Sequence, residues 1–179
     1  GTVFQAPKPL KKQLKSLQRL SRSYSRKVKG SNNRLKASKR LSKLHWKISN
    51  TRKDFLHKVS MKICRENQTV VIEDLGVRNM MKNRKLSRAI SDIGWSEFRR
   101  QLEYKGKLFG TQVIVADRYY PSSKTCSICG FVKSNLTLSE RVFRCESCGA
   151  EIDRDLNAAK NLYTLGLREI YACGHRVRP

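Results

Sequence analysis

The stretch CSICGFVKSNLTLSERVFRCESCGAEIDRDLNAAKN, residues 126–161, decides the fold, because two CxxC pairs precede an acidic run. The pairs are Cys126/Cys129 and Cys145/Cys148, with fifteen residues between Cys129 and Cys145. In a CxxC turn the backbone folds back, so both sulfurs can face one ion at about 2.3 Å. Four cysteines at this spacing predict a closed, structural Zn²⁺ site.

Glycines follow both pairs, and the remaining cysteines stand apart from them. Gly130 and Gly149 each come after the second cysteine of a pair, where a tight turn favours positive φ. Two disulfides formed by the four cysteines are the alternative to a zinc site. The basic composition and the lack of a signal-peptide pattern at Gly1 predict a reducing, cytoplasmic compartment, which disfavours them. We expect Cys64 and Cys173 to be neutral, packed thiols.

The net charge indicates a polyanionic partner. The 179 residues carry 39 Lys and Arg against 14 Asp and Glu, a formal charge of +25. Such a field favours nucleic acid. No apolar run approaches the roughly 20 residues that a bilayer-spanning helix needs, so the sequence excludes that class.

Most of the excess charge lies in the first sixty residues, which hold eighteen Lys or Arg and one acid, Asp54. We expect a strand end at 2–5, a helix at 10–28, a turn at 30–33 and a second helix at 35–63 that packs antiparallel to the first. A solvated hairpin without a ligand is the alternative, but solvated helices usually mix charge signs. Candidate nucleic-acid-binding residues here are Lys11, Lys12, Lys15, Arg19, Arg22 and Arg26.

Two buried strands are predicted in the second half of the chain. The first covers 69–72 and ends at Glu73 and Asp74, and the second covers 112–116. A basic link at 80–85 precedes one helix over about 86–109. The inner face of that helix is expected to carry Ile90, Ile93 or Gly94, Phe98, Leu102 and Leu108. The outer face is expected to carry Arg88, Arg99, Arg100, Lys105 and Lys107. Arg99 and Arg100 are further candidates for binding nucleic acid.

A last helix is expected to begin near Asp153, with acids in its first turn, and to stop at Gly166. In a parallel sheet with right-handed crossovers the two strand ends are neighbours, and the returning helix begins near them. Glu73 and either Asp153 or Asp155 should therefore converge, as ligands for Mg²⁺ or Mn²⁺ in phosphodiester hydrolysis. Glu73 and Asp74 could equally be loop acids. Ser122 and Ser123 lack a base and are discounted as nucleophiles.

Four motifs in order carry a family resemblance. They are VIEDL at 71–75, RAIS at 88–91 with WSEFRRQLEYK at 95–105, SSKTCSICG at 122–130, and DRDLNAAKN at 153–161. Together they resemble the C-terminal portion of TnpB, an insertion-sequence-encoded protein similar to type V CRISPR effector nucleases. The resemblance covers nearly the whole chain.

The resemblance implies an α/β fold: an incomplete ribonuclease H-like (RuvC) domain with a basic helical-hairpin insertion and a four-cysteine zinc-ribbon insertion. It also implies an RNA-guided DNA endonuclease with guide RNA and target DNA as partners. Glu73 then matches the family's second catalytic carboxylate and Asp155 its third, while Asp153 starts the helix and Arg154 lies near the phosphate. Zn²⁺ would be structural and Mg²⁺ or Mn²⁺ catalytic.

One departure from the family pattern stands out. The family's first catalytic Asp lies in a motif like G-I-D-x-G, which these 179 residues lack. We therefore expect this chain alone to be an incompetent nuclease that needs the missing N-terminal part. The alternatives are a non-catalytic guide-RNA or DNA-binding module and a strand-transfer transposase. A nuclease-dead repressor is disfavoured because Glu73 and Asp155 are intact.

The expected organisation has five segments. They are a strand end with the basic hairpin at 1–68, core strands and helix at 69–120, the zinc ribbon at 121–150, the last RuvC helix at 151–166, and a basic tail at 167–179.

Overall fold

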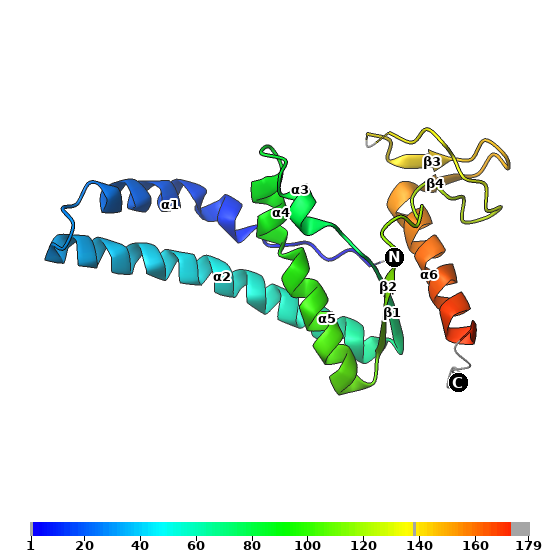
Figure 1. The fold of residues 1–179 in the computed structure, drawn as a ribbon, viewed down its shortest axis with the longest axis horizontal. Coiled ribbons are helices and arrows are strands. Elements are labelled where there is room, and N and C mark those ends of the chain that lie inside the picture. Colours follow the sequence, from blue (N-terminus) through cyan, green and yellow to red (C-terminus); the bar gives the residue numbers. More distant parts are fainter. Residues whose placement is uncertain (1, 138, 173–179) are drawn as a thin grey trace. The chain divides into compact units, whose positions relative to one another are not determined.

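A computed structural model describes residues 2–137 and 139–172, which divide into two compact units (Figure 1). The hairpin unit comprises Val3–Arg65 and Gly76–Lys105. The sheet unit comprises Gly1–Thr2, Glu66–Leu75 and Gly106–Pro179. The predicted α/β class is confirmed. Within the described ranges, no helix has the length and apolar character to cross a membrane. Cys173 and the predicted tail beyond residue 172 lie outside the described residues.

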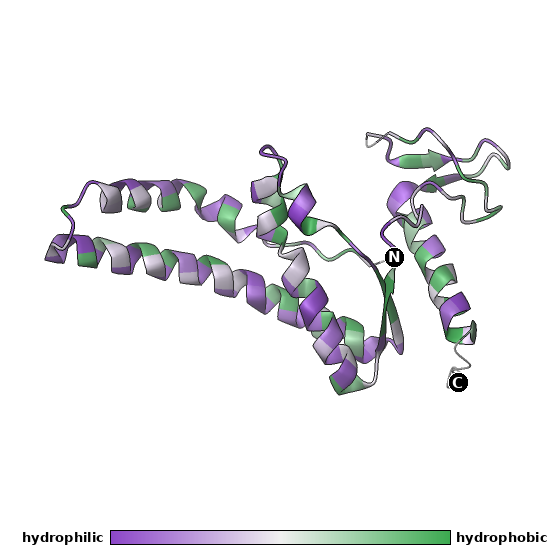
Figure 2. Ribbon diagram, in the orientation of Figure 1, coloured by the Kyte–Doolittle hydropathy of each residue, from purple (hydrophilic) through white to green (hydrophobic). Residues whose placement is uncertain are grey.

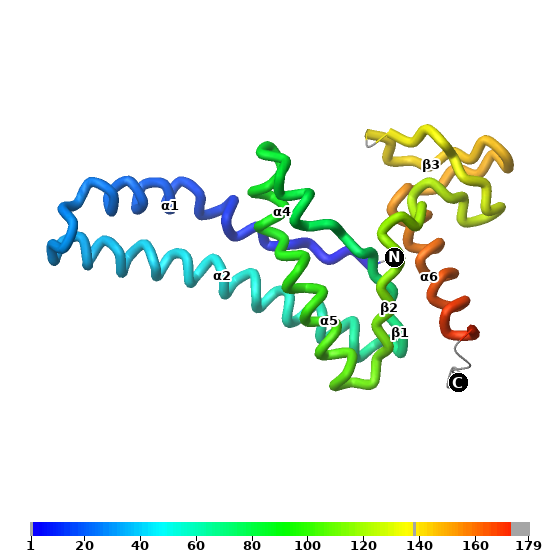
Figure 3. The backbone as a smooth tube through the Cα atoms, viewed as in Figure 1, coloured from blue at the N-terminus to red at the C-terminus, as the bar shows by residue number. Residues whose placement is uncertain are grey.

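The hairpin unit is built on two long antiparallel helices, α1 (Pro9–Ser25) and α2 (Asn32–Glu66), which the tube in Figure 3 follows through the turn between them. Pro9 begins α1, where its missing N–H costs nothing. Ser31 caps α2 by accepting the Arg34 N–H at 3.2 Å. The Arg34 guanidinium lies 4.3 Å above the Tyr24 ring and links the helices near the turn. The predicted antiparallel pair is confirmed.

The start of α1 is capped from a distant helix. Its N-cap residue, Lys8, has φ 47 and contributes no side-chain cap bond. Instead the buried carboxylate of Asp92 accepts the N–H groups of Leu10 and Lys11 at 3.1–3.2 Å and pairs with Arg52 at 3.0 Å. A carboxylate at this position satisfies helix-terminal donors and opposes the positive end of the helix dipole.

The strand end predicted at 2–5 is wrong. The described residues 2–8 form neither strand nor helix, and Val3 and Phe4 remain 78% and 39% exposed. A strand needs a hydrogen-bonded neighbour, and no described strand pairs with this segment.

The single helix predicted at 86–109 is also wrong. The segment forms two helices, α4 (Ser87–Ile93) and α5 (Trp95–Phe109), because Gly94 adopts φ 78 and ends α4. A short helix, α3 (Val77–Met80), precedes them. Ile90 and Leu102 of the predicted inner face are buried, as expected, at 8% and 0% exposure. The rest of the prediction fails near the end of α5. Leu108 is 71% exposed, whereas Lys105, expected outside, is buried and donates to the His57 carbonyl and to Ser60 Oγ, both at 2.8 Å.

The sheet unit contains the two predicted strands, β1 (Thr69–Glu73) and β2 (Gln112–Ala116). Ile114 and Ala116 of β2 are buried, whereas 69–72 of β1 are only half-buried, so the predicted burial of β1 is wrong. The two strands pair in parallel with Glu73 opposite Ala116, so the predicted meeting of the strand ends is confirmed. Helix α6 (Arg154–Ala172) packs on them. It continues through Gly166, so the predicted stop is wrong. Any Cβ on Gly166 would overlap Val71 Cγ2, and the glycine instead permits close approach of helix and strand.

The cysteine-bearing part of this unit has its own small core. Strands β3 (Val142–Arg144) and β4 (Glu151–Asp153) pair antiparallel. Phe143 is fully buried and clusters with Cys126 and Cys145. Figure 2 shows hydrophilic residues recurring along α1 and α2.

Candidate functional site

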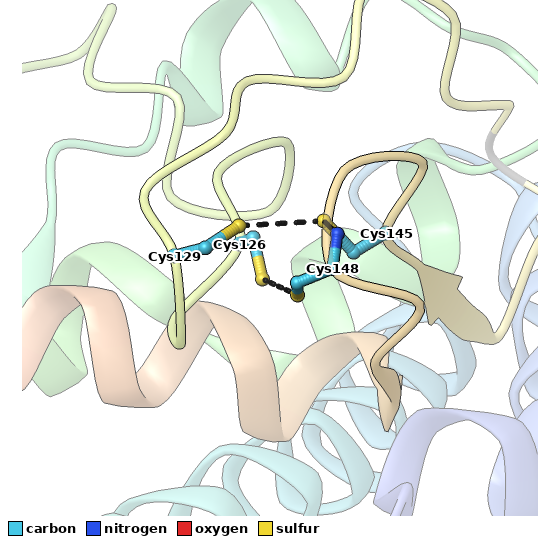
Figure 4. A group of neighbouring side chains, drawn as sticks. All are labelled: Cys126, Cys129, Cys145 and Cys148. Carbon is cyan, nitrogen blue, oxygen red and sulfur yellow. Dashed lines mark hydrogen bonds between the residues drawn. The ribbon is translucent and has the colours of Figure 1, made fainter.

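The four cysteines converge in the geometry of one tetrahedral ion (Figure 4). Cys126 Sγ lies 3.8 Å from Cys148 Sγ, Cys129 Sγ lies 3.5 Å from Cys145 Sγ, and all four sulfurs lie within 4.8 Å of one another. A tetrahedron with Zn–S distances of 2.3 Å has sulfurs about 3.8 Å apart. A disulfide needs about 2.05 Å, so these spacings fit a metal better than bridges.

Two matching turns hold the cysteines in place. The Gly130 N–H donates to the Cys126 carbonyl at 3.0 Å, and the Gly149 N–H donates to the Cys145 carbonyl at 3.1 Å. Both glycines have positive φ, 78 and 73, as the sequence predicts. Each CxxCG segment is therefore a separate knuckle that presents two sulfurs to the same point.

The backbone already prepares one sulfur to bind as a thiolate. The Cys148 N–H donates to Cys145 Sγ at 3.5 Å and, with a further backbone donor at Ser147, lowers the pKa of the Cys145 thiol to about 6. An Ala150 N–H acts the same way on Cys148, but hydrogen bonds shared with Cys145 and Cys129 raise the Cys148 pKa to about 12. A bound cation would displace the protons that the thiols still share.

Two asparagines of α6 attach the first knuckle to the helix, and we call them the asparagine clamp. Asn157 accepts the Ser127 N–H at 2.9 Å and donates to the Thr125 carbonyl at 2.7 Å. Asn161 donates to the carbonyls of Ser122 and Thr125 at 2.7 and 2.6 Å. Both side chains are buried, at 0% and 6% exposure. Their spacing of four residues places them on one helix face.

The clamp is a feature that sequence reasoning missed. Asn157 and Asn161 stand in the motif DRDLNAAKN, and the only local signal is a pair of asparagines four residues apart in a helix. Asparagine favours turns over helix interiors, so two of them inside a helix indicate polar partners elsewhere in the fold.

The two predicted catalytic carboxylates line one cavity of about 460 Å³. Glu73 reaches it from the end of β1, and Asp155 from the first turn of α6. Lys124 and Arg154 line the same cavity and bring two cations to it. Arg154 Nε lies 3.7 Å from Asp155 Oδ1.

Different contacts position the neighbouring acids. Asp153 Oδ1 accepts the N–H groups of Asp155 and Leu156, both at 3.0 Å, so Asp153 caps α6 and leaves the Asp155 carboxylate 80% exposed. Asp74 forms an ion pair with Arg118. Of the two acids that end the first strand, the one lining the cavity is Glu73.

Ser122 links the cavity to the clamp. Its hydroxyl donates to Glu73 Oε1 at 2.7 Å, and its carbonyl accepts the Asn161 amide. Ser122 is 6% exposed, whereas Glu73 is exposed to solvent. The serine discounted as a nucleophile thus orients a carboxylate. A continuous path of hydrogen bonds joins the first knuckle, the clamp, Ser122 and Glu73.

The basic candidates separate into exposed and paired groups. On α1 a shallow groove of about 610 Å³ is lined by Lys15, Gln18, Arg19, Arg22, Ser23, Arg26 and Lys27. Lys12 lines a smaller cavity of about 100 Å³ beside Ile48. The backbone N–H of Lys11 donates to Asp92. On α5, Arg99 pairs with Glu103 at 2.8 Å and Arg100 with Glu97 at 2.7 Å. Four of the six predicted α1 cations therefore share one surface.

The ion pair between Arg100 and Glu97 lowers the pKa of the Glu97 carboxyl. Hydrogen bonds from Arg100 and Gln101 lower the pKa of Glu97 to about 2. Burial lowers the pKa of Lys105, whose ammonium has neutral oxygens as partners. Burial also raises the pKa of the Cys64 thiol, which agrees with the expected neutral thiol.

Two family models match the chain. Residues 1–84 match the family described as "Probable transposase", OrfB_IS605, and residues 95–162 match "Cas12f1-like, TNB domain".

Curated relatives resemble the chain along its full length. A Streptomyces pristinaespiralis protein named "Putative RNA-guided DNA endonuclease" is 50% identical over 179 residues, which are 100% of this chain and 44% of that protein. The Escherichia coli (strain K12) protein "Putative RNA-guided DNA endonuclease InsQ" is 39% identical over 193 residues, 99% of this chain and 48% of that protein. The chain spans about half the length of these curated relatives.

A solved structure shares the fold. It is the cryo-EM structure of a Cas12f1–sgRNA–target DNA complex, matched with TM-score 0.56 and 21% identity over 84% of this chain and 42% of that one. The resemblance read from the four sequence motifs is confirmed, and the chain belongs to the TnpB-like family.

Proposed function

We propose that this chain is the RuvC and zinc-ribbon part of an RNA-guided DNA endonuclease that cuts DNA by divalent-metal-dependent phosphodiester hydrolysis. The observation that carries the proposal is the single cavity shared by Glu73 and Asp155, with Lys124 and Arg154 beside them. Relatives named as RNA-guided DNA endonucleases support the reaction class.

The carboxylates are the proposed metal ligands. Carboxylate oxygens suit Mg²⁺ or Mn²⁺, and a bound ion there would activate water and stabilise the leaving oxygen. Ser122 holds one Glu73 oxygen at 2.7 Å and so orients the carboxylate. Asp153, by capping α6, leaves the Asp155 carboxylate exposed to the cavity. The four cysteines would hold Zn²⁺ in a closed structural site.

The cations have two proposed tasks. Lys124 and Arg154 would hold the scissile phosphate beside the carboxylates, because an ammonium and a guanidinium both bind phosphate oxygens. The α1 groove would bind the backbone of guide RNA or target DNA. Arg99 and Arg100 already pair with carboxylates, so we assign them a weaker contact than the α1 cations.

The proposed fold assignment is a ribonuclease H-like core. The parallel pairing of β1 and β2, with α6 packed on them, fits part of such a sheet. The hairpin at 1–68 and the ribbon at 121–150 would be its two insertions.

We also propose that this chain needs a further carboxylate. Two acids line the cavity, and the family motif of type G-I-D-x-G is not among the 179 residues. The part of the relatives that this chain does not cover would supply the third acid and the remaining guide contacts. Without that part, the chain would act as a nucleic-acid-binding module.

A chimera tests the proposal. Replacing the matching segment of the Streptomyces pristinaespiralis protein with this chain should give guide-dependent DNA cleavage with Mg²⁺. Glu73→Gln or Asp155→Asn in the chimera should reduce cleavage by at least about 100-fold without loss of RNA binding. Cleavage that survives both substitutions would overturn the assignment. Robust cleavage by the purified 179-residue chain, lost in Glu73→Gln, would overturn the need for a further carboxylate.

A further inference from the structure

A tryptophan stands exposed on the basic helix α2. Trp46 is 66% exposed, although tryptophan is usually well buried. Ile48, two residues on, is 6% exposed and faces the inside of the hairpin unit. Two residues correspond to about 200° of helical rotation, so Trp46 lies on nearly the opposite face.

Lysines flank Trp46 at helical spacing and form what we call the α2 stripe. Its members follow one another at intervals of three and four residues, which places them on one face of the helix. They are Lys36, Lys39, Lys43, Trp46, Asn50 and Lys53. All four lysines are exposed, and the stripe extends about 26 Å along the axis. None of the nucleic-acid candidates predicted from the sequence lies in it.

Little negative charge opposes the stripe. Helix α2 contains two acids, Asp54 and Glu66, and Asp54 pairs with Lys58 at 2.8 Å. The Lys53 charge contributes to lowering the pKa of Glu97, whereas no described ion pair engages Lys36, Lys39 or Lys43. The stripe therefore combines an exposed indole with four exposed lysines on one face of the helix.

This combination matches one ligand chemistry. A flat aromatic face binds an exposed base by stacking, and neighbouring lysines bind the phosphates on either side of it. A purely apolar partner would require desolvation of the lysines, and an acidic peptide would leave the indole unused. In a duplex the bases already stack on each other. We propose that the α2 stripe binds unpaired nucleotides of RNA or DNA, with one base stacked on Trp46. The inference rests on the proposed nucleic-acid function and adds a second site to the α1 groove.

Fluorescence of the full chain tests the stacking directly. Trp46 and Trp95 are its two tryptophans, and Trp95 lies edge-on to Phe98 with centroids 6.5 Å apart. A Trp95→Phe background leaves Trp46 as the reporter. Single-stranded oligonucleotide should quench its emission, and a blunt duplex of equal length should quench it far less. Trp46→Ala should weaken single-strand binding by about 5- to 150-fold, and Trp46→Phe should retain most of the affinity.

Two controls separate stacking from charge. Tyr163, an exposed aromatic on α6, gives the matched variant Tyr163→Ala, which should bind as tightly as the parent. Lys43→Gln should reduce the slope of log affinity against log salt by about 1. Equal affinity of Trp46→Ala and parent, or dissociation of a dimer by Trp46→Ala, would overturn the stripe proposal. Salt-dependent binding would then still support the α1 groove, and a failed chimera cleavage assay would not affect the stacking result.

Discussion

The sheet unit and the hairpin unit use polar side chains in different ways. In the sheet unit, Asn157, Asn161 and Ser122 are buried, and each bonds a specified backbone or carboxylate atom. The hairpin unit also has buried polar groups, Asp92 and Lys105, but the cations of its α1 groove face outward. Atom-specific bonds place reactive groups, whereas an array of charges binds a polyanion through its summed field. Single substitutions should therefore cost much at buried bonds of this kind and act in small increments along the α1 groove.

The largest effect is expected from removing a cysteine. Cys145→Ser should abolish binding of one Zn²⁺ per chain and unfold residues of the ribbon, because the metal free energy stabilises the closed site. Zinc titration with a chromogenic chelator, together with amide spectra, measures both. Cys64→Ser removes a buried thiol outside the cluster and should keep the zinc. Equal zinc content in both variants would refute the four-cysteine site.

Gly166→Ala should destabilise the sheet unit by about 1–3 kcal/mol, because the added methyl overlaps Val71 Cγ2. Chemical denaturation measures the change in unfolding free energy. Gly76→Ala is the matched control, since a Cβ there meets nothing within 4 Å. Adding Val71→Ala should reduce the cost of Gly166→Ala. Additive effects of the two substitutions would show that their contact is not the cause.

Asn157→Ala should cost about 1–2 kcal/mol, because it leaves the Ser127 N–H without its acceptor in a buried position. Asn157→Asp keeps an acceptor and should restore part of that loss. The same denaturation experiment measures both variants, and amide exchange at Ser127 reports the bond itself. If Asn157→Asp is no better than Asn157→Ala, the accepted hydrogen bond is not what stabilises the knuckle.

The smallest effect concerns acid stability in the hairpin unit. Glu97 has its pKa lowered to about 2, so its stabilising contribution is complete above about pH 4.5 and is lost as pH falls towards 2. Glu97→Gln should therefore flatten the fall in unfolding free energy between pH 4.5 and 2. Glu103→Gln, on the same helix with an exposed partner, is the control. Parallel pH profiles for Glu97→Gln and the parent would contradict the assigned pKa.

Local patterns predicted more of the sheet unit than of the hairpin unit. Cysteine spacing predicts the knuckles because the four ligands come from two short turns, and the β-branched runs predict both strands. The convergence of Glu73 and Asp155 on one cavity followed from parallel-sheet topology. The predictions that failed concern residues whose surroundings are set by partners distant in the sequence. The role of Gly166 is set by Val71, and the burial of Lys105 is set by Ser60 and His57.

The asparagine clamp and the end of α4 at Gly94 also depend on partners that are distant in the sequence. Nothing near Asn157 in the sequence reveals that Ser127 and Thr125 are its partners. Gly94 could be accommodated in a continuous helix at modest cost, and it takes positive φ where its neighbours Arg52 and Leu56 lie close. Periodicity therefore predicts the buried Ile90 and Leu102 but not the end of α4 at Gly94.

The Asp92 cap has a consequence for the order of folding. The acceptor for Leu10 stands 82 residues later in the chain, so during synthesis α1 emerges long before its N-terminal N–H groups can be satisfied. Closing that loop has an entropic cost which α1 alone cannot recover. The amides of Leu10 and Lys11 should therefore gain protection from hydrogen exchange together with α4. Helix α1 would be made before α4, yet it would acquire its native N-terminal end only when α4 is in place.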